Sequence, residues 1–378
     1  MQKLIFFGAL LGLFWACSSD NGMDVSDDMS PVPEPVSFQR GPMLTNWADN
    51  IIVPSYEAFA AETANMKAAF ESFKNNADEA NLVALRAAWF NAYKAWQAVD
   101  MFEIGPAETV GLRLSINTYP TNVDLVEANI ADGNADLTLS SNRAAKGFPA
   151  LDYLINGLGE TDTDIVSKLN ASSTGSAQIA YIDNVIADMQ NLTDQVLSEW
   201  KSGYRDTFVN NNGASSTASV DRFVNDYIFY YEKFLRAGKM GIPLGVFSGS
   251  TLPGNLEAFY KGDISNELFL EGLGAVQDFF NGKHFGETTS GESLASYLDA
   301  LNTVKNGEDL NTIINGQFNT ARDMVASLNN FRQEIENNTP PTEMLLAYDE
   351  VQRIVPLLKV DMVSAMSISV DFVDADGD

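Results

Sequence analysis

The amino-acid sequence predicts an all-α protein, and two observations favour this class. Apolar side chains recur at intervals of three and four residues through most of the chain after residue 43, which places them on one face of a helix. The clearest run comprises Leu82, Leu85, Trp89, Tyr93 and Trp96. Patterns typical of strands are nearly absent, and the short run at residues 370–373 is long enough for an edge pairing only. We therefore expect long helices packed in bundles.

The expected helices follow one another along the chain between clear stop signals. The first covers residues 45–73, with Pro54 as a candidate kink. The aromatic-rich helix comes next, with Asp78 as its N-cap and Gly105 and Pro106 at its end. Further helices are expected at residues 178–208, 219–237, 255–280, 294–304, 310–336 and 342–369.

Helix-breaking residues mark the candidate domain boundary. Gly, Asn, Ser and Pro gather at residues 172–176, 210–216, 238–254 and 281–291. The chain is longer than a single core usually supports, so two domains are expected. Because the 210–216 run leaves room for a helical bundle on either side, we predict an N-terminal helical bundle domain at residues 42–212. A C-terminal helical bundle domain then covers residues 213–378.

Charge and composition exclude several classes of function. Lys and Arg number 23 against 51 Asp and Glu, which gives a formal net charge of -28. Such a surface repels phosphate backbones, so nucleic acid is excluded as a partner. The single Cys and single His also exclude a disulfide framework, a zinc site built on Cys and an ordinary Cys/His dyad.

The N-terminus predicts export and lipid anchoring. Residues 1–16 combine Lys3 with a short apolar run, as in a signal peptide, and the run is too short to span a membrane. Cys17 follows a small residue, which resembles the lipobox of bacterial lipoproteins; the alternative is a free Cys beside an ordinary cleavage site. Residues 17–41 are acidic and Pro-rich, as in a flexible tether. We expect a lipid anchor at Cys17 in the outer membrane of a Gram-negative bacterium, on the periplasmic or the cell-surface face.

Three segments together resemble the imelysin family of exported bacterial proteins, which includes iron-regulated lipoproteins. They are residues 86–106, with RAAW at the start and FEIGP at the end, residues 116–124, beginning INTYP, and residues 147–154, GFPALDYL. The resemblance implies two helical, four-helix-bundle-like domains packed with a cleft at their junction. It also implies a role in iron uptake, with iron or another divalent metal as the candidate cofactor and iron-uptake or envelope proteins as candidate partners.

The signature of that family, Gly-x-His-x-x-Glu, is degenerate in this chain. Gly147 matches the glycine, Pro149 stands in the place of the histidine, and Asp152 stands in the place of the glutamate. An imidazole and a carboxylate three residues apart on a helix can share a metal ion or exchange a proton. Proline has no donor, acceptor or charge, so this half of the site is lost.

Polar residues in the irregular chain beside these motifs are the candidate cleft residues. Loops between packed helical units commonly form binding clefts. The candidates for metal or ligand binding are Gly147, Asp152, Tyr153, Glu103, Arg113, Asn117, Tyr119 and Asp124. Arg86 lies beside the aromatic stripe and is a further candidate, which would hold an anionic ligand group or Asp152. The alternative is that these residues cap helices and form structural ion pairs.

The expected function is therefore that of a non-catalytic exported lipoprotein that binds a metal, an iron complex or another ligand. One alternative is an imelysin-type metallopeptidase with Asp152 and nearby carboxylates as ligands. It is disfavoured because the motif histidine is Pro149 and the only histidine, His284, lies in a distant loop. A second alternative is a cell-envelope protein-interaction module that has lost the ancestral site. The aromatic residues at 227–234 are expected to pack between the two bundles, and the acidic residues at 371–378 to be solvated.

Overall fold

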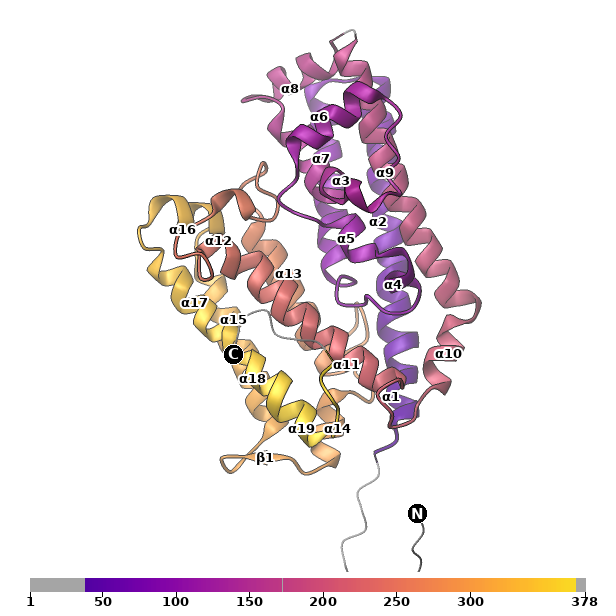
Figure 1. Ribbon diagram of the computed structural model, residues 1–378, viewed down its shortest axis with the longest axis vertical. Coiled ribbons are helices and arrows are strands. Elements are labelled where there is room, and N and C mark those ends of the chain that lie inside the picture. The colour runs from indigo at the N-terminus through magenta and orange to yellow at the C-terminus, as the bar shows by residue number, and fades with distance from the viewer. Residues whose placement is uncertain (1–37, 172, 372–378) are drawn as a thin grey trace, which may run out of the picture. The chain divides into compact units, whose positions relative to one another are not determined.

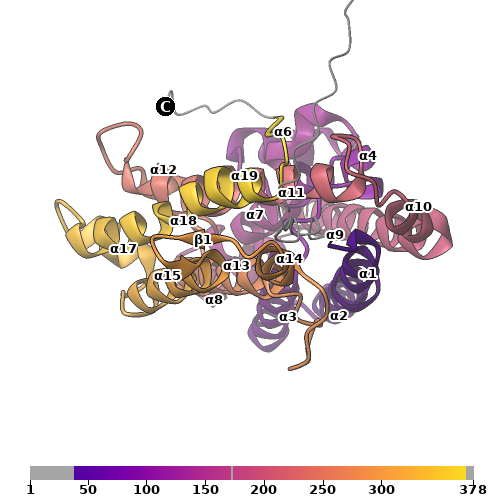
Figure 2. The same cartoon turned by 90° about the horizontal axis from the view of Figure 1, so that it is seen from below.

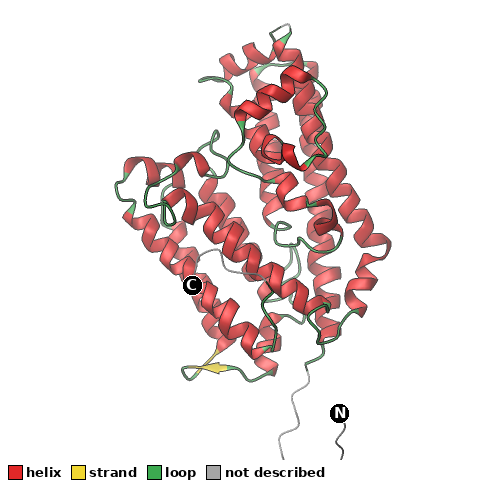
Figure 3. Ribbon diagram, viewed as in Figure 1, coloured by secondary structure: helices red, strands yellow, loops and turns green. Residues whose placement is uncertain are grey.

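The structure is a computed structural model that describes residues 38–171 and 173–371. Helices make up nearly all of its regular structure, which confirms the predicted all-α class (Figure 1, Figure 3). The one pair of strands in the described chain is a short antiparallel hairpin of β1 (Val304–Lys305) and β2 (Glu308–Asp309). The described residues belong to one compact unit, and the division at residue 212 stays a prediction. The predicted signal peptide, Cys17, the predicted tether up to residue 37 and the acidic residues 372–378 lie outside the described residues.

A first group of helices gathers around α2 (Val53–Asn75), which packs along α3 (Glu79–Gln97) and α9 (Thr174–Glu199). The chain enters through α1 (Arg40–Asn46), which begins one residue before the expected end of the tether. The wide π-helical turn η1 (Trp47–Ile52) leads into α2. Pro54 lies inside this continuous helical run and cannot donate to the carbonyl oxygen of Asn50 one turn earlier. That oxygen accepts a hydrogen bond from the backbone N of Phe285 at 2.8 Å instead, so the helix continues through Pro54.

The helix α3 begins where the sequence predicted it to begin. Asp78 is its N-cap and accepts a hydrogen bond from the backbone N of Asn81 at 2.8 Å. The predicted stripe is buried, from Leu82 to Trp96. The helix ends at Gln97, earlier than expected, and the chain then turns until Gly105, whose φ is 53°.

Shorter helical elements complete this group. They are α4 (Pro106–Val110), α5 (Leu112–Ile116), α6 (Val123–Asp132), η2 (Ser140–Ala145), α7 (Gly147–Asp152), η3 (Tyr153–Gly157), α8 (Asp162–Leu169), η4 (Trp200–Tyr204) and α10 (Arg205–Asn210).

A second group of helices is centred on α13 (Ser265–Phe280), which packs against α15 (Leu310–Ala326) and also against α3 of the first group. The group begins with α11 (Ser219–Phe229), which continues into the long π-helical segment η5 (Tyr230–Gly241). Figure 2 shows these helices from below. The remaining elements are α12 (Ile242–Leu244), η6 (Pro253–Asn255), α14 (Leu294–Ala300), α16 (Phe331–Asn337), α17 (Thr342–Gln352), α18 (Ile354–Pro356), η7 (Leu357–Met362) and α19 (Val363–Ala365).

Four expected helices of this group differ from the structure. The helix predicted at 294–304 ends at Ala300, and Val304 lies in β1. The helix predicted at 255–280 begins only at Ser265, and the preceding residues are irregular. The helix predicted at 310–336 is interrupted between α15 and α16, and the last one ends at Ala365. The aromatic residues Tyr227, Tyr230 and Tyr231 are fully buried, as expected for a packing role. None of the helices in the described chain combines the length and the apolar character needed to cross a membrane.

Candidate functional site

A pocket of about 190 Å³ lies where the degenerate motif meets the irregular segment before α13. Its walls come from the Tyr119 turn, from the first turns of α7 and from the segment between Gly254 and Tyr260. The lining residues are Tyr119, Pro120, Thr121, Pro149, Asp152, Gly254, Leu256, Ala258, Phe259 and Tyr260. Tyr119 and Asp152 were both predicted to share a cleft, and the structure brings them together.

Gly147 starts the helix that carries the motif, and the geometry requires a glycine there. Its φ is 72°, and a Cβ atom at this position would lie 2.1 Å from the carbonyl oxygen of Ile116. The close approach seats α7 directly on the chain around Asn117. Pro149 occupies the first turn of this helix, where its missing N–H leaves no carbonyl unpaired.

Asp152 holds two distant parts of the chain together. Its side chain is 1% exposed, and its Oδ2 accepts a hydrogen bond from the backbone N of Tyr260 at 2.8 Å. Its Oδ1 accepts from the backbone N of Lys261 at 3.0 Å and from Asn156 Nδ2 at 3.0 Å. The carboxylate therefore fixes the segment before α13 across the pocket, next to Ala258, whose φ is 54°.

Burial raises the pKa of Asp152 to about 7, although the hydrogen bonds from Tyr260, Lys261 and Asn156 lower it. An aspartate in the unfolded chain titrates near pH 4, so between about pH 4 and 7 the folded protein holds a proton that the unfolded chain has released. A group whose pKa is raised on folding stabilises the protein at low pH. That contribution is lost as the pH rises through the folded value.

We therefore expect the free energy of unfolding to fall more steeply between pH 5 and pH 8 in the wild type than in Asp152→Asn, by about 1–3 kcal/mol. The asparagine keeps the shape of the side chain but does not titrate. Urea unfolding at pH 5, 6, 7 and 8 measures the difference. Parallel pH profiles for the two proteins would show that Asp152 does not titrate in this range.

A buried polar centre lies next to the pocket, around Glu257. Its Oε1 accepts hydrogen bonds from Lys239 Nζ at 2.6 Å, from Asn117 Nδ2 at 2.8 Å and from Gln97 Nε2 at 3.3 Å. Tyr93 OH donates to Asn117 Oδ1 at 2.5 Å. We call these five residues the Glu257 centre. Leu256 and Ala258, which flank Glu257, line the pocket, so the centre is connected to its wall.

A second buried cluster surrounds Arg113, whose side chain is 4% exposed. Its guanidinium donates to Asp226 at 3.1 and 3.2 Å and to the backbone oxygen of Asp100 at 2.9 Å. Its backbone N donates to Glu103 Oε2 at 2.9 Å. Burial raises the pKa of Glu103 to about 7 and that of Asp100 to about 6, with Arg113 acting in the opposite direction. Arg113 thus links Glu103, in the first helical group, to Asp226 in the second.

Several polar atoms in this interior have no hydrogen-bond partner among the described residues. They include Gln97 Oε1, Tyr230 OH and Glu257 Oε2. Gln97 Oε1 and Tyr230 OH approach the same point, since they lie 3.5 and 3.4 Å from where a Cβ of Gly272 would be. Buried polar atoms are normally satisfied by protein or by water.

Three of the predicted site residues have other roles. Arg86 donates to the carbonyl oxygen of Ile155 at 2.8 Å and pairs with Asp162 at 2.6 Å, which agrees with the alternative of a structural ion pair. Asp124 is exposed in the first turn of α6. Tyr153 donates to Glu127 at 2.7 Å, while its ring packs near that of Tyr260.

Lys239, Glu257 and Gln97 were not predicted as site residues from the sequence. The available signal was the set of charged residues Glu232, Arg236 and Lys239 on a helix rich in aromatic residues, because a charge that such a helix buries must find a partner. Glu257, the partner of Lys239, lies in irregular chain and carried no pattern of its own.

The donor set at the pocket does not fit a metal ion. Asp152 is the only carboxylate among the lining residues, and its oxygens already accept three hydrogen bonds. Within residues 38–171 and 173–371, no group of three or more His, Cys, Asp or Glu side chains is arranged to hold a metal. His284 lies in a separate loop, where its Nδ1 is 3.0 Å from Thr289 Oγ1 and 3.5 Å from Glu287.

The helical groups and the pocket on the altered motif place the protein among the imelysin-like helical proteins. The sequence model of imelysin matches residues 52–356, and the chain therefore belongs to the imelysin family. This confirms the resemblance read from the three segments of the sequence.

Solved structures share this fold. An imelysin-like protein from Psychrobacter arcticum superposes with a TM-score of 0.68 at 18% identity, over 88% of this chain and 97% of that one. A putative iron-regulated protein A precursor from Parabacteroides distasonis gives 0.68 at 16% identity, over 86% and 95%. Iron-regulated protein A of Synechococcus elongatus is 27% identical over 112 residues, which span 30% of each chain.

Proposed function

We propose that this member of the imelysin family is a non-catalytic binding protein whose pocket takes a small organic molecule or an iron complex rather than a bare metal ion. The proposal depends on the altered motif, which has lost its histidine and whose remaining carboxylate is already hydrogen-bonded within the protein. Pro149 supplies no functional group, and the Asp152 carboxylate accepts two backbone hydrogen bonds and one from Asn156. Its role is to position the wall of the pocket.

A hydrolytic reaction is disfavoured by the same arrangement. The raised pKa of Asp152 would suit acid–base chemistry, but such chemistry needs a second group within reach of the substrate. The lining residues include no histidine, lysine or second carboxylate. A metal-activated water would need a set of ligands with an open position, and the pocket does not supply one.

The pocket favours a small occupant. Its volume of about 190 Å³ is below the range of roughly 300–1,000 Å³ that is usual for drug-sized ligands. Phe259, Tyr260 and Leu256 make its walls largely apolar, and Tyr119 adds a hydroxyl. Such walls suit a compact ring or the organic edge of a metal complex.

The link to iron comes from relatives. Two proteins similar to this chain are named iron-regulated protein A, and one of these is named a precursor. These names support an exported protein that acts in iron supply. Anchoring through Cys17 in the outer membrane, and contact with iron-uptake or envelope proteins, belong to the same proposal.

Two binding experiments test the proposal. The purified protein is dialysed against iron supplied as its neutral tris(acetohydroxamate) complex and, separately, as iron(II), zinc(II) or calcium(II). We expect retention of the iron complex and no stoichiometric binding of the bare ions. Gly254→Trp should reduce the amount of complex retained at least tenfold, because the indole would occupy the pocket. The substitution itself is tolerated, since a Cβ at Gly254 meets no atom within 4 Å.

The control is Gly316→Trp, which places the same side chain in open space on α15 and should bind like the wild type. Stoichiometric binding of a bare metal that Asp152→Asn loses would refute the proposal in favour of a metal site. Cleavage of casein by the wild type, but not by Asp152→Asn, would establish the peptidase alternative. Failure of the wild type to retain the iron complex would overturn the proposal for iron complexes of this kind.

A further inference from the structure

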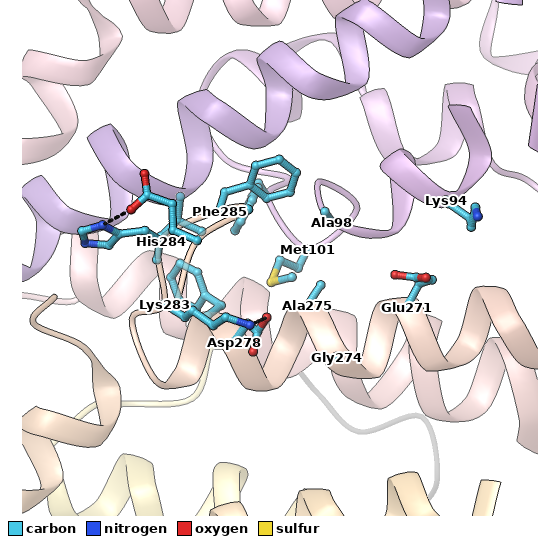
Figure 4. A pocket seen from close by; sticks show the side chains of 15 residues that line it. Lys94, Ala98, Met101, Glu271, Gly274, Ala275, Asp278, Lys283, His284 and Phe285 are labelled. Atoms are coloured by element: carbon cyan, nitrogen blue, oxygen red, sulfur yellow. Dashed lines mark hydrogen bonds and ion pairs between the residues drawn. The ribbon is translucent and has the colours of Figure 1, made fainter. Parts of the chain in front are cut away.

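A second and larger cavity lies on another part of the surface, between α3, α13 and the loop that follows α13. Its volume is about 380 Å³, twice that of the pocket on Asp152, and the two share no lining residue. Figure 4 shows its walls, with Ala98 and Met101 from the turn that follows α3 opposite Gly274 and Ala275 on α13. This volume falls in the range of ordinary small-molecule sites.

The cavity exists because small residues face each other there. Gly274 lies in the interior of α13, where a glycine costs about 1 kcal/mol relative to alanine. A Cβ at this position would meet no atom within 4 Å, so packing does not require a glycine. Gly272 on the same helix differs, since its Cβ would lie 3.0 Å from Leu235. The effect of Gly274 is to leave the cavity open.

The floor of the cavity is apolar and its rim is charged. Met101, Phe102 and Phe279 are each 1% exposed and form the floor. On the rim, Lys283 pairs with Asp278 at 2.8 Å. His284 lies 3.5 Å from Glu287 at the same end (Figure 4).

The other end of the cavity carries an uncompensated carboxylate. Lys94 pairs with Glu267 at 3.4 Å, outside the cavity lining. Glu271, one helical turn before Gly274, makes no hydrogen bond or ion pair with any residue of the described chain, and Figure 4 shows it at the rim beside Lys94. Each cation of the rim therefore has a carboxylate partner, whereas Glu271 has none. The net charge of -28 further favours the approach of cations.

We propose that this cavity binds a small molecule with one protonated amine and an apolar body of about the size of an aromatic ring system. The ammonium group pairs with Glu271. The body lies over Gly274 and Ala275 and contacts Met101 and Phe285, where an aromatic ring gains from the thioether and the ring face. The site is independent of the pocket on Asp152.

The test is a calorimetric titration of the full chain with tryptamine and with tryptophol, which replaces the amine by a hydroxyl and keeps the indole. We expect tryptamine to bind with a Kd of about 0.1–1 mM, as suits a ligand of its size. Glu271→Gln should weaken tryptamine about 3- to 10-fold and leave tryptophol unchanged. Gly274→Phe should weaken both at least tenfold by filling the cavity.

Matched controls separate the site from general attraction to an acidic protein. Glu343→Gln removes a carboxylate from the first turn of α17, and Gly316→Phe adds the same ring in open space on α15; both should bind like the wild type. The proposal is overturned by the absence of saturable tryptamine binding, by equal effects of the two glutamate variants, or by unchanged binding in a folded Gly274→Phe protein. Gly254→Trp, which closes the other pocket, should leave tryptamine binding intact.

Discussion

Replacing Lys239 with methionine is expected to lower the free energy of unfolding by about 3–5 kcal/mol. The Lys239 side chain is 2% exposed, and its Nζ lies 2.6 Å from Oε1 of Glu257, whose side chain is 1% exposed. Methionine has a similar volume but carries no charge, so the Glu257 carboxylate is left buried without a cation. Removing one partner of a buried pair costs far more than the pair contributes as a whole. Urea unfolding at pH 7 measures the loss.

A double variant distinguishes charge from packing in this experiment. In Lys239→Met with Glu257→Gln, the buried charge is gone, and the glutamine oxygen can still accept from Asn117 and Gln97. We expect the double variant to recover at least half of the stability lost in the single one. A single variant that loses less than about 1 kcal/mol would show that water solvates Glu257 and that the Glu257 centre is not closed.

Gly147→Ala is expected to have a comparably large effect, above about 3 kcal/mol. The positive φ alone costs an alanine about 1–2 kcal/mol. The larger cost comes from the new Cβ, which would lie 2.1 Å from the oxygen of Ile116, a backbone atom that cannot move without shifting Asn117. Chemical unfolding and the far-ultraviolet dichroism spectrum measure stability and helix content together.

Gly133→Ala is the matched control for this substitution. Gly133 follows α6 with a φ of 71°, but a Cβ there meets no atom within 4 Å. It should therefore lose only the cost of the backbone conformation, about 1–2 kcal/mol. Equal losses in the two variants would contradict the role assigned to the contact between Gly147 and Ile116.

The fold was predictable because helices depend on local patterns. The stripe from Leu82 to Trp96 and the cap at Asp78 are properties of a single segment, and both are found in the structure. Gly147 and Tyr119 were identified through a family motif rather than through geometry. The cost of replacing Gly147 follows only from its distance to Ile116, which no local pattern reveals.

The error before α13 has a physical cause. Residues 255–264 have apolar residues at helical spacing, yet Asp152 accepts hydrogen bonds from the backbone N–H groups of Tyr260 and Lys261. A helix through this segment would need the same donors for its own carbonyls. A contact from more than one hundred residues away therefore overrides the local preference, and the sequence carries no sign of it.

The Glu257 centre was missed for the same reason. Glu257 meets Asn117 across 140 residues of chain and Gln97 across 160. Arg113, which was predicted as a ligand-binding candidate, has its hydrogen-bonding capacity directed toward Asp226 and the backbone of Asp100. Residue type and position identified a polar interior, but the pairing of charges within it depends on the folded structure.

The hydrogen bonds from Tyr260 and Lys261 to Asp152 also set an order of events during synthesis. Asp152 leaves the ribosome 108 residues before Tyr260, which corresponds to roughly 5–20 s at ordinary rates of translation. During this interval the helices around α2 can assemble, while the Asp152 carboxylate and the Arg113 guanidinium remain hydrated and without their later partners. A nascent chain that stops before residue 260 thus contains the whole altered motif but cannot form the pocket.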